Sequence, residues 1–209
     1  MYVFAGLGNP GKEYDGTRHN IGFAIVDSLE TKMERSLGWK AGKGEYYYAK
    51  GMIANEDVIL CKPITYMNHS GRAVRDVLAF FKAEISGIIV ICDDIAIPLG
   101  QLRLRLNGSD GGHNGLSSII YELGTDEFPR LRFGVGADFH QGEQARYVLS
   151  KFKESEAKLV EEMKISAVGG SIEIIHNGLA KAMNVINVKP KEDSALKAEI
   201  KNRNANLAD

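Results

Sequence analysis

The stretch from Ile88 to Cys92 constrains the fold more than any other part of the sequence, because all five of its residues are apolar and four of them are β-branched. An apolar run with no polar residue at alternate positions is typical of a strand that is buried on both faces. A strand of this kind needs helices on both sides of its sheet. The run therefore favours an α/β fold around a central, largely parallel sheet.

Shorter apolar runs and amphipathic segments alternate along the rest of the chain. Residues 46–53 and 57–61 flank a short polar turn and are typical of a hairpin at one edge of the sheet. The long predicted helix over residues 153–186 is expected to be interrupted or closely packed at Gly169 and Gly170. Predicted strands cover residues 2–7, 46–53, 57–61, 88–92, 101–106 and 130–135, and predicted helices cover residues 21–33, 74–81, 114–123 and 153–186.

We therefore expect a single α/β domain over residues 1–187, a mixed but largely parallel sheet with helices on both faces, and a polar C-terminal tail over residues 188–209. The 26 Lys and Arg residues nearly balance 27 Asp and Glu residues, giving a net charge of −1. This excludes binding of nucleic acid by bulk charge but allows a local basic patch.

The sequence also indicates a cytoplasmic protein. Its first residues lack the basic and apolar regions of a secretory signal, and no apolar stretch approaches the roughly 18 residues of a membrane span. Cys61 and Cys92 both lie in apolar runs without metal-binding or redox spacing, so we expect both to be buried, reduced thiols.

Polar side chains follow several predicted strands or open a predicted helix. The carboxyl ends of parallel strands meet at one edge of a sheet, where ligands bind. Each residue alone is explained by a cap or turn, as Asn114 is by capping the helix that follows it. Together they predict one site, formed by Asn9, His19, Asn68, Asp93, His113 and Asn114.

His19 and Asp93 form the pair with catalytic potential. A neutral imidazole can take a proton from water, and a carboxylate on its other nitrogen fixes the tautomer and stabilises the imidazolium. Asparagine amides can donate to a developing oxyanion, each contributing about 3–4 kcal/mol. With no nucleophile in the set, the pattern predicts water attack on an ester or amide. The alternative is that His19 only bonds backbone at a helix end.

Other familiar motifs are not met. Gly6 to Gly11 matches the GxGxxG pattern, but Pro10 and the polar residues 12–17 delay the helix, and no acidic residue follows at the required distance. The sequence has no GxSxG elbow, and its five histidines lack metal-binding spacing. We therefore expect neither a dinucleotide nor a metal.

Arginines on two predicted strands suggest a phosphate-binding surface. Arg103 and Arg105 share one strand face, and Arg130 and Arg132 share a face of another. Solvated strand faces explain them equally well. Tyr14 and Tyr66 flank the same loops, where they would either stack on a base or ribose or pack at the rim.

Five sequence blocks, in order, resemble the bacterial peptidyl-tRNA hydrolase family. The resemblance covers nearly the whole chain except the tail. The blocks are Gly6–Gly11 with Tyr14, Thr17–Asn20 and Gly22; Lys62–Pro63 with Thr65–Asn68 and Ser70–Gly71; Asp93–Asp94; Gly108–Leu116; and Phe128–Gly136.

The resemblance implies a monomer, without metal or organic cofactor, that hydrolyses the ester between a peptide and the 3′ ribose of tRNA. His19 would be the general base and Asp93 its orienting acid. Asn9 would distinguish peptidyl-tRNA from aminoacyl-tRNA. Asn68 and Asn114 would bind the peptide backbone and the 3′ end. The expected further substrate and tRNA contacts are Tyr14, Tyr66, Met67, His113, Arg103, Arg105 and Arg132.

The chain departs from the family pattern at a few positions. Asp110 stands where a small residue is usual, Arg105 replaces a common lysine, and residues 138–142 replace a Pro/Gly-rich loop. The alternative function is a non-catalytic RNA-binding relative on the same scaffold. Retention of His19 and Asp93 with the asparagines argues against it, because binding alone needs no activated water. A nucleoside- or sugar-processing enzyme of similar topology has no support in these motifs.

Overall fold

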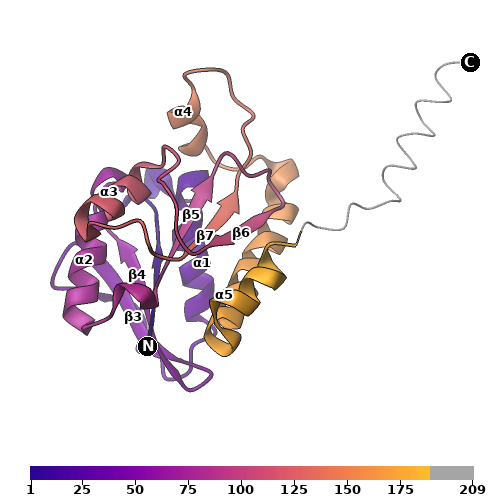
Figure 1. The fold of residues 1–209 in the computed structure, drawn as a ribbon. Helices are drawn as coiled ribbons and strands as arrows, with labels where there is room; N and C mark the ends of the chain where they lie inside the picture. The colour runs from indigo at the N-terminus through magenta and orange to yellow at the C-terminus, as the bar shows by residue number, and fades with distance from the viewer. Residues whose placement is uncertain (189–209) are drawn as a thin grey trace, which may run out of the picture.

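The computed structural model describes residues 1–188, which form seven strands of one sheet with five α-helices around it (Figure 1). The sheet order is β2-β3-β4-β1-β5-β7-β6. Apart from Val188, the predicted tail lies outside the described residues. The strands are β1 Tyr2–Gly6, β2 Lys40–Ala41, β3 Tyr46–Ile53, β4 Glu56–Pro63, β5 Ile88–Asp94, β6 Leu102–Arg105 and β7 Arg130–Gly134.

The four central strands, β4, β1, β5 and β7, run parallel, while β2, β3 and β6 add antiparallel edges. All seven residues of β5 are buried, as the apolar run predicts. Its side chains alternate between two cores: Ile89 and Ile91 belong to one, and Ile88, Val90 and Cys92 to the other. The predicted mixed, largely parallel sheet is confirmed.

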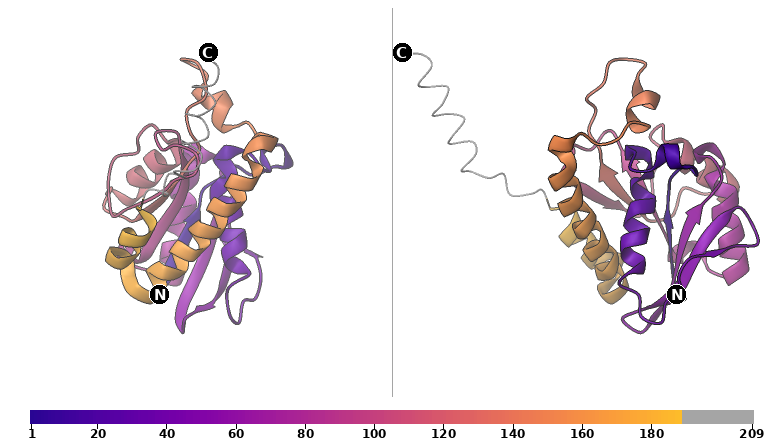
Figure 2. Two further views of the ribbon diagram at one scale, coloured as in Figure 1. Left: turned by 90° about the vertical axis from the view of Figure 1, so that its right-hand side faces the viewer. Right: turned by 180° about the vertical axis from the view of Figure 1, so that it is seen from behind.

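Helices cover both faces of the sheet, which confirms the predicted layers (Figures 1 and 2). Helices α1 and α5 supply residues to the core with Ile89 and Ile91, and α2 and α3 supply the core on the opposite face. None of these helices, within the described residues, is long and apolar enough to span a membrane. The helices are α1 Ile21–Glu30, α2 Ser70–Phe81, α3 Asn114–Leu123, α4 Gln144–Val148 and α5 Ala157–Ile186.

The predicted hairpin at one edge is confirmed as β3 and β4, which pair from Tyr46 with Pro63 to Ile53 with Glu56. Its two turn residues, Ala54 and Asn55, both have positive φ, of 53° and 64°. This conformation matches the twist of a two-residue hairpin, although alanine adopts it rarely.

The prediction for the long helix is correct in part. Gly170 is closely packed, since a Cβ there would lie 2.8 Å from the Ile186 side chain. The interruption, however, is at Gly178, with φ 79° and ψ 167°, and the last part of α5 folds back from it (Figure 2). The Asn187 amide then accepts from the Leu104 N–H at 2.8 Å and donates to the Leu104 carbonyl at 3.1 Å, covering part of the free edge of β6.

Candidate active site

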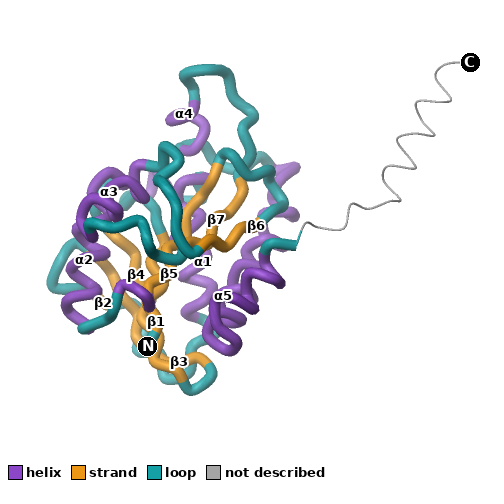
Figure 3. Tube along the Cα trace, in the orientation of Figure 1, coloured by secondary structure: helices purple, strands orange, loops and turns teal. Residues whose placement is uncertain are grey.

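A cleft of about 940 Å³ opens where the parallel strands end. Asn9, which follows β1, and Asp93, the next-to-last residue of β5, both line the cleft, as expected for ligand sites in open α/β sheets. Its walls come from the loops before α2 and α3 and from α4. Figure 3 shows α4 as a short helix within the long connection from β7 to α5.

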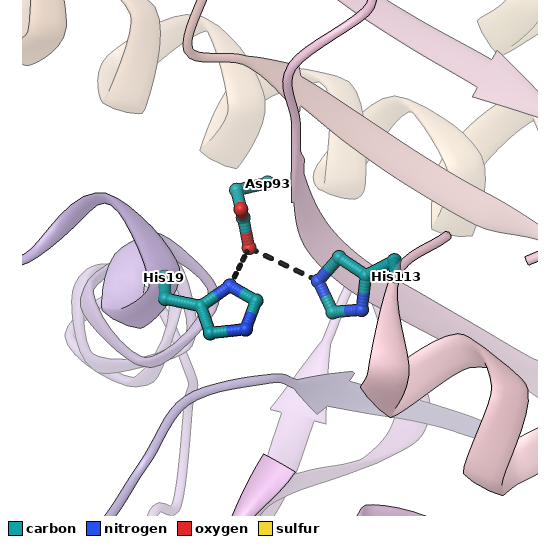
Figure 4. Close-up of side chains that lie close together, drawn as sticks. All are labelled: His19, Asp93 and His113. Atoms are coloured by element: carbon teal, nitrogen blue, oxygen red, sulfur yellow. Dashed lines mark hydrogen bonds and ion pairs between the residues drawn. The ribbon is translucent and has the colours of Figure 1, made fainter. Parts of the chain in front are cut away.

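His19, Asp93 and His113 meet in this cleft (Figure 4). His19 belongs to a 3₁₀ turn, Arg18–Asn20, that leads into α1. One carboxylate oxygen of Asp93, Oδ1, lies 2.7 Å from His19 Nδ1 and 3.0 Å from His113 Nε2. The predicted contact between residues 19 and 93 is therefore present.

Hydrogen bonds to backbone fix the tautomer of His113. Its Nδ1 accepts from the N–H groups of Gly115 at 3.1 Å and Leu116 at 3.3 Å, so this nitrogen carries no proton. The proton is on Nε2, which donates to Asp93. His113 is thus the N-cap of α3, and the prediction that Asn114 caps this helix is wrong: Asn114 is the first helical residue.

The same reasoning applies to His19. An ionised Asp93 only accepts hydrogen bonds, so His19 Nδ1 donates to it and Nε2 keeps its lone pair. Figure 4 shows this second nitrogen turned away from Asp93. The imidazole is therefore oriented as a base.

Asp93 is held ionised in a buried position. Burial alone would raise its pKa, but attraction to His113 and hydrogen bonds from both imidazoles outweigh that effect. The net result is an Asp93 pKa well below its ordinary value. A permanent negative charge at this point stabilises any positive charge that His19 gains.

Asn9 is fixed by its neighbours in one amide orientation. Its Oδ1 accepts from the Met67 N–H at 2.8 Å, which leaves Nδ2 as a donor at the cleft. Asn20 holds the Asn9 backbone on both sides, with Oδ1 accepting from the Asn9 N–H at 2.8 Å and Nδ2 donating to the Asn9 carbonyl at 2.9 Å.

Sequence reasoning missed this function of Asn20. The residue stands in the Thr17–Asn20 block of the family resemblance, directly after His19, and that position was the available signal. Its effect is to tie the loop after β1 to the turn that carries His19.

Most of the other predicted residues line the cleft: Tyr66, Met67, Asn68, His113, Asn114 and Arg132. Tyr66 and Asn68 are exposed, and the Asn68 amide lies 3.4 Å from His69 Nε2. His113 has both ring nitrogens engaged within the protein, so only its ring face is left for a substrate.

Three predicted residues do not line the cleft: Tyr14, Arg103 and Arg105. Tyr14 ends a separate 3₁₀ turn, and its carbonyl accepts from the Thr17 hydroxyl at 2.8 Å. Arg103 is the direct cross-strand partner of Arg132, so β6 carries its half-buried arginines beside the cleft rather than within it.

The arginines of β7 differ in their environments. Arg132 reaches the cleft and forms an ion pair with Asp94. Arg130 is buried and donates to the carbonyls of Gly108 at 2.5 Å and Ser109 at 3.0 Å. The interpretation of Arg130 as a phosphate-binding side chain is therefore wrong, because its guanidinium holds the glycine-rich loop.

The ligand atoms of His19, Asp93 and His113 lie within 4.8 Å of one another, which is close enough to hold a metal ion. The hydrogen-bond pattern does not favour one. A metal on His113 Nε2 would displace the proton to Nδ1, which already accepts from two backbone N–H groups. The set fits a proton-transfer network better than a metal centre.

Comparison with known proteins agrees with this geometry. The family model described as peptidyl-tRNA hydrolase matches residues 3–195. The chain is 47% identical over 190 residues to the peptidyl-tRNA hydrolase of Thermoanaerobacter sp. (strain X514), covering 90% of this chain and 100% of that protein. It is 44% identical over 188 residues to that of Chlorobaculum parvum, covering 90% and 98%.

Solved structures are similar as well. A crystal structure of peptidyl-tRNA hydrolase from Acinetobacter baumannii matches with a TM-score of 0.82 and 32% identity, covering 90% of this chain and 95% of that one. A complex of peptidyl-tRNA hydrolase with N-propanol matches with a TM-score of 0.83 and 32% identity, covering 92% and 97%. With the family model matching most of its length, this chain belongs to the peptidyl-tRNA hydrolase family.

Proposed function

We propose that this chain hydrolyses the ester that joins a peptide's terminal carboxyl to the 3′ ribose of tRNA, releasing free tRNA and peptide. The observation that carries the proposal is the His19–Asp93 contact of 2.7 Å inside the cleft of a member of this family. The neutral amides around that pair suit an uncharged ester carbonyl.

In the proposed reaction, His19 Nε2 takes a proton from a water molecule as the water oxygen attacks the ester carbon. The carbonyl oxygen becomes an oxyanion, and amide donors at the cleft stabilise it. When the tetrahedral intermediate collapses, the bond to the 3′ oxygen breaks, and that oxygen takes the proton back from the imidazolium. Asp93 holds the His19 ring and balances its transient charge.

The remaining residues have proposed binding roles. The Asn9 Nδ2 donor would recognise the blocked amino group that distinguishes peptidyl-tRNA from aminoacyl-tRNA. Asn68 and Asn114 would bind the peptide backbone and the 3′ end. Tyr66 and Met67 would pack against them, with Tyr14 outside the cleft at the rim. The basic side chains Arg103, Arg105 and Arg132 would meet tRNA phosphates.

We propose a different role for His113 from that of a substrate ligand. Because its Nδ1 caps α3 and its Nε2 donates to Asp93, it would position Asp93 relative to His19. We further propose that the protein acts as a monomer in the cytoplasm, where ribosomes supply the substrate.

The test is a multiple-turnover assay with N-acetyl-aminoacyl-tRNA, with aminoacyl-tRNA and uncharged tRNA as controls. We expect many N-acetyl amino acids released per enzyme and little release from aminoacyl-tRNA. Stoichiometric tRNA binding without turnover would contradict the proposal and favour the RNA-binding alternative.

A further inference from the structure

Arg18 has one of the largest fully buried side chains among the described residues. It directly precedes His19 in the sequence, but it has no role in the proposed reaction. A buried guanidinium is unfavourable unless it is paired and hydrogen-bonded. The contacts of the Arg18 side chain therefore indicate its role in the structure.

Every directional contact of the Arg18 side chain goes to the segment between α4 and α5. Nη1 donates to the Ser150 hydroxyl at 3.0 Å and to the Lys151 carbonyl at 2.5 Å. Nη2 forms an ion pair with Glu156 at 2.7 Å. Among the described residues, Nε–H has no partner.

Two aromatic rings complete the environment of Arg18. The guanidinium carbon lies 4.4 Å from the centroid of Tyr147, in α4, and 4.9 Å from that of Phe152. Tyr147 also donates from its hydroxyl to the Val135 carbonyl at 2.7 Å. Arg18 thus fixes both the last part of α4 and the residues that follow it.

The helix that directly precedes this segment, α4, forms a wall of the cleft. Gln144, Ala145, Val148 and Leu149, within or directly after α4, all line the cleft. The backbone joins the same parts, since the Arg18 N–H donates to the Ser150 carbonyl at 3.0 Å. The position of this wall is therefore coupled to the turn that carries His19.

We propose that Arg18 is a positioning residue that fixes the α4 wall of the cleft against the His19 turn and so determines how tightly the substrate is held. It acts on the wall and not on the base, because the His19 ring is oriented separately by Asp93. The kinetic consequence rests on the proposed function, whereas the structural coupling does not.

Lysine is the informative replacement at this position. Arg18→Lys keeps the positive charge for Glu156, but an ammonium cannot supply the planar fork that reaches three acceptors and stacks on rings. Glu156→Gln is the second variant and removes the ion pair from the other side. Arg75→Lys is the matched control, because Arg75 is exposed on α2, away from the α4 wall, and pairs with Glu122 of α3.

The experiment combines hydrogen exchange with kinetics. In Arg18→Lys, and less so in Glu156→Gln, we expect faster amide exchange confined to residues 144–152. KM for N-acetyl-aminoacyl-tRNA should rise about three- to tenfold, with little change in kcat or in its pH profile. The double variant should be less than additive, and Arg75→Lys should behave as wild type.

Unchanged exchange over residues 144–152 in both Arg18→Lys and Glu156→Gln would overturn the proposal. A loss of kcat with an altered pH profile would overturn it too, because Arg18 would then act through His19. If the wild-type protein released no product at all, the proposed function would fail, while the exchange data would still decide the coupling.

Discussion

At the scale of single residues, His113 forms contacts with both nitrogens of its ring. Its Nδ1 caps the N-terminus of α3 by accepting from two backbone N–H groups, and its Nε2 donates to the carboxylate that orients His19. The sequence places His113 at the right loop, but it cannot show which nitrogen faces which partner, because that depends on the angle at which α3 meets β5.

His113→Asn and His113→Ala separate the two contacts. Asparagine is a strong N-cap but cannot at the same time reach Asp93. We predict that His113→Asn keeps the N-cap of α3 but loses about tenfold in kcat, the size expected for one charge-assisted hydrogen bond. His113→Ala should lose the same activity and should also be less stable than His113→Asn, by about 1 kcal/mol of unfolding free energy. Denaturant unfolding measures the stability of each variant, and the hydrolysis assay measures its kcat. Equal stability of the two variants would contradict the capping role.

At the scale of elements, the strength of the local pattern decides what the sequence predicts. The run Ile88–Cys92 contains no polar residue, so its burial on both faces of the sheet can be predicted directly from the sequence. The position of the break in α5 cannot be predicted in this way, because Gly169, Gly170 and Gly178 are all glycines and the local sequence does not distinguish them. Only tertiary packing selects among them: the last part of the helix must turn back for Ile186 to reach Gly170.

Gly178→Ala and Gly169→Ala make this difference measurable. Gly178 has φ 79° and ψ 167°, a region that an alanine rarely enters, whereas Gly169 is helical with open space around it. We predict that Gly178→Ala destabilises the protein by about 1–3 kcal/mol. Gly169→Ala should instead stabilise it by up to about 1 kcal/mol through helix propensity. Urea unfolding of both variants tests this, and a stable Gly178→Ala would argue against the observed break.

At the scale of the whole molecule, the convergence of the site is predictable because parallel strands end at one edge. Asn9, His19 and Asp93 come together for that reason. The sequence cannot show which of the arginines reach the cleft. Strand alternation predicts that two side chains share a face of the sheet, but not which other residues lie beside them. The Arg130 side chain donates to the glycine-rich loop, while Arg103 and Arg105 lie on β6 beside the cleft.

Because the net charge of the chain is near zero, the proposed binding of tRNA has to depend on local basic side chains such as Arg103, Arg105 and Arg132. We predict that Arg103→Ala raises KM at low salt and lowers the dependence of log KM on log salt by about one unit, as for loss of one phosphate contact. Lys50→Ala, an exposed change on β3 at the other end of the sheet, should alter neither. A drop in kcat with an unchanged salt dependence would place Arg103 in the chemistry instead.

The central claim, that the imidazole of His19 activates water, is tested most directly by the kcat of His19→Asn on N-acetyl-aminoacyl-tRNA. His176→Asn serves as the control, because His176 is exposed on α5. The account predicts that kcat falls by about a hundred- to ten-thousandfold in His19→Asn, with tRNA binding retained. A His19→Asn variant that turns over as fast as His176→Asn would contradict it.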